Sequence, residues 1–156
     1  ENRDEILKRC QWVHVIGNVV FSHAGITSRW FENIHSVHPE VKTIMDINSL
    51  PPSDEFGFWP CKLSDYYGDS ETQPLTWVRP GCLVEKGIPG YVYVVGHSTN
   101  KKIVNYKEQC LSFMTEDESR DWCKNDIWLC DTMPNEYLVI EYDGETFDFI
   151  PTKVAK

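Results

Sequence analysis

The sequence has no run of apolar residues that approaches the roughly 20 needed for a membrane-spanning helix, and it has no cluster of basic side chains. Lys and Arg number 15 against 24 Asp and Glu, which gives a formal net charge of -9. Because nucleic-acid phosphates and anionic membranes are held mainly by clustered Lys and Arg, this balance argues against both as partners. A small phosphorylated substrate stays compatible with it, since one local metal site can outweigh a distant negative background.

Cysteine motifs for zinc or redox chemistry are also missing, because none of the six cysteines is spaced as CxxC. The chain is larger than a typical disulfide-stapled scaffold. Cys10 and Cys130 lie inside apolar segments, where a reduced thiol behaves as a small core residue. We therefore expect reduced structural thiols and a cytoplasmic protein, with a zinc or disulfide framework as the alternative.

What the sequence does have is enough apolar material for one folded domain over residues 1–156. Hydrophobic residues make up 41% of the 156 and aromatic residues 13%, which is sufficient for a core of useful size. No repeat or linker divides the chain. Because residue 1 is Glu rather than Met, we expect the chain to be processed or to be part of a longer protein.

Strands dominate the predicted elements. The run WVHVIGNVVFS (12–22) predicts a hairpin that turns at Gly17-Asn18, because both residues tolerate positive φ. A second hairpin is predicted at Asp143-Gly144 for the same reason. The predicted strands, besides that first hairpin, are 91–95, 103–106, 127–130, 136–142 and 146–150.

Helical patterns are fewer and shorter. One helix is expected to begin at Thr27 or Ser28, with a buried side of Trp30, Phe31, Ile34 and Val37. Others are expected within 1–10 and from Pro39, while 111–125 is ambiguous and 48–74 reads as a long irregular segment. The fold class expected is α/β leaning towards α+β.

Two of the predicted strands end in the same way. VVFSHAG leads into His23, and VYVVGHS leads into His97, each with small residues around the histidine. Small neighbours let a ligand approach the backbone closely, and histidine is the commonest nitrogen ligand of first-row metals. The two side chains would meet if their strands share one edge of a sheet. The alternative is that each is a hydrogen-bonded structural histidine.

The remaining histidines give weaker signals. His35 and His38 stand at i and i+3 near a helix end and could form half of a metal site. Ordinary roles at a helix end are the simpler interpretation for both. His14 alternates with Val13 and Val15, so it is expected to face solvent or a neighbouring layer.

Four segments, in order, resemble the calcineurin-like metallophosphoesterases, and they cover residues 19–144. VVFSHAGIT (19–27) resembles the family's strand ending in His-Gly-Gly or His-Ala-Gly. LTWVRP (75–80) resembles the Trp-x-Arg segment of the serine/threonine phosphoprotein phosphatase branch. VYVVGHSTN (92–100) resembles the Gly-His-Thr block, with Ser98 at the usual Thr. IWLCDTMPNEYLVIEYDG (127–144) resembles the closing strands.

The resemblance implies roles for particular residues. His23 and His97 would be ligands to one metal of a dinuclear centre of the Mn, Fe or Zn type, and Arg79 would bind the substrate phosphate. Metal-activated water would be the nucleophile in this hydrolase chemistry. Asp131 would sit near the site without an assigned role. From the residues alone, Arg79 beside Trp77 would read as a stacked or salt-bridged surface residue.

The family's Gly-Asp-x-His, Gly-Asp-x-x-Asp-Arg-Gly and Gly-Asn-His-Glu blocks do not occur in this sequence. These blocks supply most metal ligands in the family, so the chain resembles its C-terminal half, the strand-rich part of a β-sandwich flanked by helices. We expect the chain alone to bind divalent metal poorly, with partial or no occupancy, and to hydrolyse no phosphate ester. Its expected partner is the missing N-terminal half, and its uncovered apolar surface would otherwise favour a homo-oligomer.

Several functions stay open at this point. Within the enzyme class, a phosphoprotein, a small phosphoester and a dinucleoside polyphosphate are all credible substrates. The irregular segment 48–74 would lie over the pocket and tune that choice. A non-catalytic binding or scaffold domain that retains the half-fold is the main alternative, and a protein built on its cysteines is a third.

Overall fold

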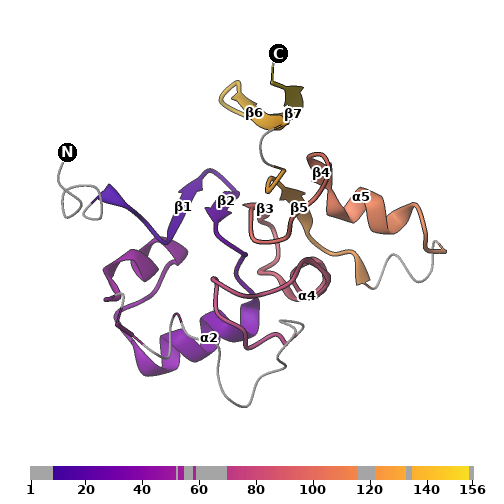
Figure 1. Cartoon of the computed structure of the whole chain (residues 1–156). Helices are drawn as coiled ribbons and strands as arrows, with labels where there is room; N and C mark the ends of the chain where they lie inside the picture. The colour runs from indigo at the N-terminus through magenta and orange to yellow at the C-terminus, as the bar shows by residue number, and fades with distance from the viewer. Residues whose placement is uncertain are drawn as a thin grey trace.

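The computed structural model describes residues 9–51, 53–54, 58, 70–115, 122–132 and 135–154. Its helical elements are α2 (Ser28–Val37), the 3-10 helix η1 (Ile44–Ser49), α4 (Pro80–Lys86) and α5 (Tyr106–Leu111). Its strands are β1 (Val13–Ile16), β2 (Val19–Ser22), β3 (Val92–Val95), β4 (Val104–Asn105), β5 (Asp126–Leu129), β6 (Glu136–Tyr142) and β7 (Phe147–Lys153). Figure 1 shows their arrangement, which is the predicted mixed α/β class. The two-sheet sandwich stays a prediction.

A five-stranded sheet in the order β1-β2-β3-β5-β4 forms the centre. β2, β3 and β5 are parallel neighbours, while β1 and β4 pair antiparallel at its two edges. The predicted Gly17-Asn18 hairpin is confirmed, and Gly17 has a φ of 57° there. Since parallel strands end at the same edge of a sheet, the residues after β2, β3 and β5 are brought side by side.

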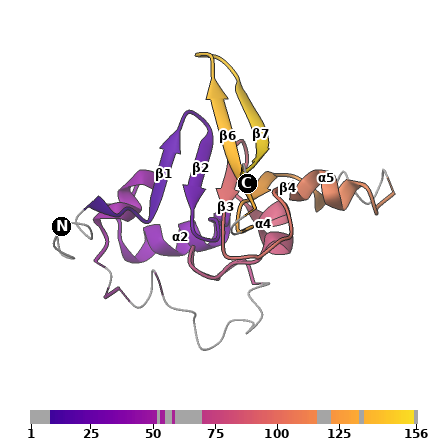
Figure 2. The same ribbon diagram turned by 45° about the horizontal axis from the view of Figure 1, so that its top comes forward.

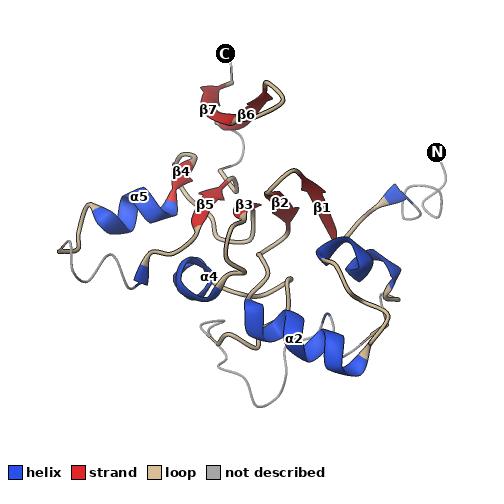
Figure 3. Ribbon diagram, turned by 180° about the vertical axis from the view of Figure 1, so that it is seen from behind, coloured by secondary structure: helices blue, strands red, loops and turns tan. Residues whose placement is uncertain are grey.

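The core lies between this sheet and the helices that cover one of its faces (Figure 3). Val20, Tyr93 and Ile127 stand opposite one another in the three parallel strands and are fully buried. Trp30 and Ile34 of α2 and Leu83 of α4 belong to the same buried cluster. The hydroxyl of Tyr93 donates to Ile26 O (3.0 Å) and accepts from Ile88 N (2.8 Å), which ties the loop after β2 to the end of α4.

The β6–β7 hairpin stands on the opposite side of the sheet from α2 and α4 (Figure 2). It is the predicted hairpin, and its turn is fixed by the Asp143 carboxylate, which accepts from the backbone N–H groups of Glu145 and Thr146. Phe149 stacks on Trp128 of β5 at a centroid distance of 5.3 Å. Between hairpin and sheet lies an open apolar cleft of about 460 Å³, lined by Phe21, Val94, Cys130, Glu136, Tyr137, Leu138 and Ile140.

Some expectations were wrong in detail. A short helix from Pro39 does not form; instead Asp46 accepts from the backbone N–H of Thr43 and starts the 3-10 turn at Ile44. The helices α4 and α5 were not predicted. Each has only six or seven residues, too few for a helical period to emerge, although Pro80 at the first turn of α4 is a start signal. Residues 1–8 of the helix expected in 1–10, and most of 48–74, lie outside the described residues.

The cysteines also differ from expectation. Cys10 is exposed rather than in the core, and Cys130 is half-buried, while the buried thiols are Cys82 and Cys123. Cys10 lies three residues before β1, the first strand at the edge of the sheet, whereas Cys82 is buried by α4, a helix that the sequence pattern did not predict. No disulfide joins the described cysteines, and Cys61 lies outside the described residues.

Thiol reactivity provides a check on this burial. Burial raises the pKa of Cys130 to about 11, so its reactive thiolate is scarce at neutral pH. We expect iodoacetamide at pH 7.5 to alkylate Cys10 well before Cys130, and the Cys130 rate to rise about tenfold per pH unit up to pH ~10. Mass spectrometry of quenched digests measures both rates. Equal rates in folded protein at pH 7.5 would contradict the placement of Cys130.

Candidate metal and phosphate site

His23 and His97 meet at the edge of the sheet where the parallel strands end. His23 follows β2 directly, and His97 follows β3 after Gly96, whose N–H donates to His23 O at 2.9 Å. The Nε2 atom of His23 lies 3.0 Å from Nδ1 of His97. The two residues with matching sequence patterns are therefore brought together, as their placement on neighbouring strands predicts.

The spacing of these two nitrogens is what a shared ion requires. Imidazole nitrogens bind zinc at about 2.0–2.1 Å, so two of them on one ion at angles between 90° and the tetrahedral value lie roughly 2.9–3.4 Å apart. The observed 3.0 Å falls inside this range. The pair fits as two ligands of one metal, although a direct hydrogen bond between the rings has the same length.

The backbone of His97 is held in an unusual conformation. Its φ is 59°, and among the described residues no other non-glycine residue has a positive φ. The turn is held by Ser98 N donating to Gly96 O (2.6 Å) and by Asn100 N donating to Asp131 O (2.9 Å). Thr99 Oγ1 also donates to the Asp131 carboxylate at 3.2 Å. A left-handed histidine costs free energy, and such strain gathers at functional sites.

The electrostatics of the site favour the neutral imidazole of His97. Burial lowers the pKa of His97, and the positive charges of Arg79 and of protonated His23 lower it further, while Asp131 opposes them. Neutral imidazole is the metal-binding form. Nε2 of His97 is buried and has no hydrogen-bond partner within the part of the chain that the structure describes. A metal-bound histidine normally donates from this second nitrogen to an acceptor.

Arg79 is placed beside the histidines by the turn at 74–78. Ala24 N donates to Leu75 O at 2.9 Å, and Ala24 packs with Val78 and Cys82 in a small buried cluster, so this turn is fixed to the loop after β2. The Trp77 ring lies 5.2 Å from the His97 ring, and the Arg79 guanidinium lies 5.7 Å from the Trp77 centroid. Arg79 thus lies over the Trp77 ring, and the Trp77 ring lies beside that of His97.

Asp131 completes the row at this edge, since it comes two residues after β5, the third parallel strand. Sequence reasoning gave it no role, and its link to the 97–100 turn depends on a strand order that the sequence does not reveal. Within the described ranges, no group of three or more His, Cys, Asp and Glu side chains could hold a metal ion. The histidine pair by itself would therefore be an incomplete ligand set among the described residues.

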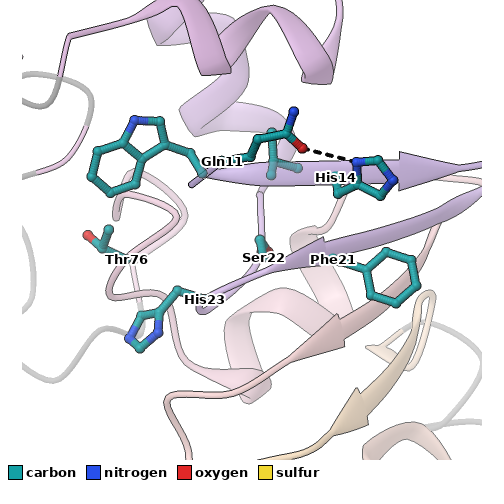
Figure 4. A pocket seen from close by; sticks show the side chains of 8 residues that line it. Gln11, His14, Phe21, Ser22, His23 and Thr76 are labelled. Carbon is teal, nitrogen blue, oxygen red and sulfur yellow. Dashed lines mark hydrogen bonds between the residues drawn. The ribbon is translucent and has the colours of Figure 1, made fainter. Parts of the chain in front are cut away.

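A hollow of about 510 Å³ opens beside His23 across β1 and β2 (Figure 4). Its apolar walls include Trp12 and Phe21, and Thr76 reaches it from the 74–78 turn. The hydroxyl of Ser22 is buried there and has no hydrogen-bond partner among the described residues. No sequence pattern marked this hollow, because it forms only when the strand pair and the turn come together.

The other histidines have local partners. His35 Nδ1 lies 2.8 Å from Val41 O, and His38 Nε2 lies 2.6 Å from the Asp54 carboxylate. His35 and His38 therefore make structural contacts at the end of α2. This agrees with the interpretation of both as ordinary helix-end residues. His14 is exposed, as expected, with its ring beside Gln11 (Figure 4).

The chain matches no family model, no curated protein and no solved structure. Within its described residues, no helix is long and apolar enough to span a membrane. Support for a function of this chain therefore comes from the site and from the sequence resemblance.

Proposed function

We propose that this chain contributes part of the active site of a metal-dependent phosphoesterase that hydrolyses phosphate monoesters. The observation that carries the proposal is the 3.0 Å approach of His23 Nε2 to His97 Nδ1 at the ends of two neighbouring parallel strands. Its support is the ordered set of four phosphoesterase-like segments, which supply His23, Arg79, His97 and Asp131 at this edge of the sheet.

Each residue has a distinct part in the proposed reaction. His23 and His97 bind a divalent ion through the two facing nitrogens, and the lowered pKa of His97 keeps its ring available for this at neutral pH. A divalent ion held there supplies Lewis acidity and lowers the pKa of a bound water. Arg79 binds phosphate oxygens with its planar fork of donors and stabilises the charge that builds up on them. Further ligands, chiefly carboxylates, come from outside the described residues.

Two alternatives have different tests. A scaffold function is favoured by the incomplete ligand set of the described residues, and it predicts no turnover in any form of the protein. A substrate panel on the intact protein separates phosphoproteins, small phosphoesters and dinucleoside polyphosphates. Deleting residues 50–70 would shift that preference if the irregular segment lies over the pocket.

Arg79 offers a sharp test of the phosphate role. In the intact protein, we expect Arg79→Ala to lower kcat/KM for a phosphate monoester by about 10²–10³-fold, the usual effect of removing one charge-stabilising donor. Arg79→Lys should recover only part of the loss, because an ammonium lacks the bidentate geometry. Steady-state assays measure this, and Arg29→Ala, which removes an exposed arginine of α2, is the matched control.

The proposed function itself is tested by assaying p-nitrophenyl phosphate with Mn²⁺ or Zn²⁺. We expect no turnover by the chain alone, and metal-dependent turnover by the intact protein that His23→Ala and His97→Ala abolish and His35→Ala leaves unchanged. Robust turnover by the chain alone would contradict the need for outside ligands. Turnover that survives His97→Ala would contradict the site.

A further inference from the structure

The hollow beside His23 has aromatic walls and an uncharged lining. Trp12 and Phe21 supply large rings to it. His14 stands opposite Phe21 in the β1–β2 pair, with their ring centroids 6.4 Å apart. None of the described residues that line the hollow is Asp, Glu, Lys or Arg. The hollow therefore suits an apolar group with a ring better than a charged one.

The walls are held in place by contacts outside the hollow. The Trp12 ring stacks on Phe58 at a centroid distance of 4.0 Å, and Trp12 N donates to Asn48 Oδ1 at 2.8 Å. On the facing turn, Thr76 Oγ1 donates to Phe58 O at 2.8 Å. Trp12 is only half-buried, so part of its ring stays accessible. A ligand that enters the hollow therefore has little wall left to order.

The hollow begins at the proposed reaction centre. His23 is one of its lining residues, and His23 Nε2 is the atom that faces His97 Nδ1 at 3.0 Å. Figure 4 shows His23 and Thr76 at one end of the hollow, with His14 and Phe21 at the other. A phosphate held at the histidine pair would therefore have its ester oxygen at the mouth of the hollow.

We propose that this hollow binds the leaving group of the substrate and selects phosphate monoesters of uncharged aromatic alcohols. The inference rests on the proposed phosphoesterase function. The rings of Trp12 and Phe21 offer face and edge contacts to an aromatic leaving group, and the buried Ser22 hydroxyl, which has no partner among the described residues, offers one polar contact. A dinucleoside polyphosphate fits less well, because its leaving group has further phosphates and the lining has no Lys or Arg to hold them.

An aromatic alcohol also suits the chemistry of this lining. In the hydrolysis, a water oxygen bonds to phosphorus and the P–O bond to the aryl oxygen breaks. One water proton ends on the aryl oxygen and the other on the phosphate. A phenol has a pKa of about 10, like tyrosine, so the aryl oxide leaves without a proton donor at the ester oxygen. The described lining residues include no Asp or Glu that could be such a donor.

Replacing Trp12 tests the subsite in the intact protein. We expect Trp12→Leu to lower the ratio of kcat/KM for phenyl phosphate to kcat/KM for ethyl phosphate by about tenfold, mainly through KM for phenyl phosphate, because one aromatic contact is lost. Trp122→Leu is the matched control, since Trp122 is also half-buried and packs on the same core cluster. It should keep the wild-type ratio. An unchanged ratio in Trp12→Leu would overturn the proposal.

Phenol titration of the whole chain, followed by nuclear magnetic resonance, tests the hollow without metal or turnover. We expect the Trp12 indole and the His14 ring to shift with one dissociation constant, while Trp122 and His35 stay unchanged. No shift at Trp12 would overturn the proposal even if the intact protein hydrolyses p-nitrophenyl phosphate. Shifts in the chain, together with no monoester turnover by the intact protein, would instead refute the proposed function and with it the leaving-group role.

Discussion

Replacing Gly25 by Ala is expected to lower the free energy of unfolding by about 3 kcal/mol or more. Gly25 has a φ of 114°, and a Cβ placed there would lie 2.3 Å from Cδ2 and 3.1 Å from Cγ of Leu83. Leu83 is fully buried in α4, so it has no free space to move into. The loop that carries His23 would be pushed away from α4, and with it the histidine.

Urea denaturation measures the loss, and Gly90→Ala is the matched control. Gly90 also has a positive φ, 85°, but nothing lies within 4 Å of its Cβ position. Gly90→Ala should therefore lower the free energy of unfolding only by the cost of a left-handed backbone conformation, about 1 kcal/mol. Equal losses for the two variants would show that the loop after β2 does not pack against α4 as described.

Replacing His97 by Gly is expected to separate stability from metal binding. The variant should retain the wild-type free energy of unfolding to within about 1 kcal/mol, because relief of the left-handed strain offsets the lost ring packing. In the intact protein, which supplies the further ligands, Zn²⁺ affinity should fall by at least about 100-fold, the most that loss of an outer-shell partner alone would cause. Denaturation curves and calorimetric titration of the same samples measure both quantities.

His35→Gly is the control with the opposite pattern. His35 lies within α2, where glycine costs about 1 kcal/mol, and it takes no part in the proposed site. We expect lower stability and unchanged Zn²⁺ affinity. If instead His97→Gly unfolded the protein while leaving its metal affinity intact, His97 would be a structural residue.

The parts of the fold that sequence could predict are those with local signals. The turn pairs Gly17-Asn18 and Asp143-Gly144 determine two hairpins, and Thr27 caps α2 by accepting from Trp30 N, where a cap was expected. The β-branched runs before His23 and His97 form strands. Each of these depends on neighbours in the chain, so a single sequence contains the necessary information.

The parts that sequence could not predict depend on pairings between distant residues. Nothing near Asp131 shows that β5 lies beside β3 or that this carboxylate holds the 97–100 turn. The hollow beside His23 requires the 74–78 turn to approach β2. These features follow from the strand order, which no local rule fixes.

The facing histidines are tested most directly by nuclear magnetic resonance of the ring nitrogens during a Zn²⁺ titration of the whole chain. The chain has five histidines, so each ring can be followed separately. We predict that Nε2 of His23 and Nδ1 of His97 shift together with one dissociation constant, while His14, His35 and His38 stay unchanged. Separate dissociation constants for His23 and His97, or an earlier shift at His35 and His38, would contradict the shared site.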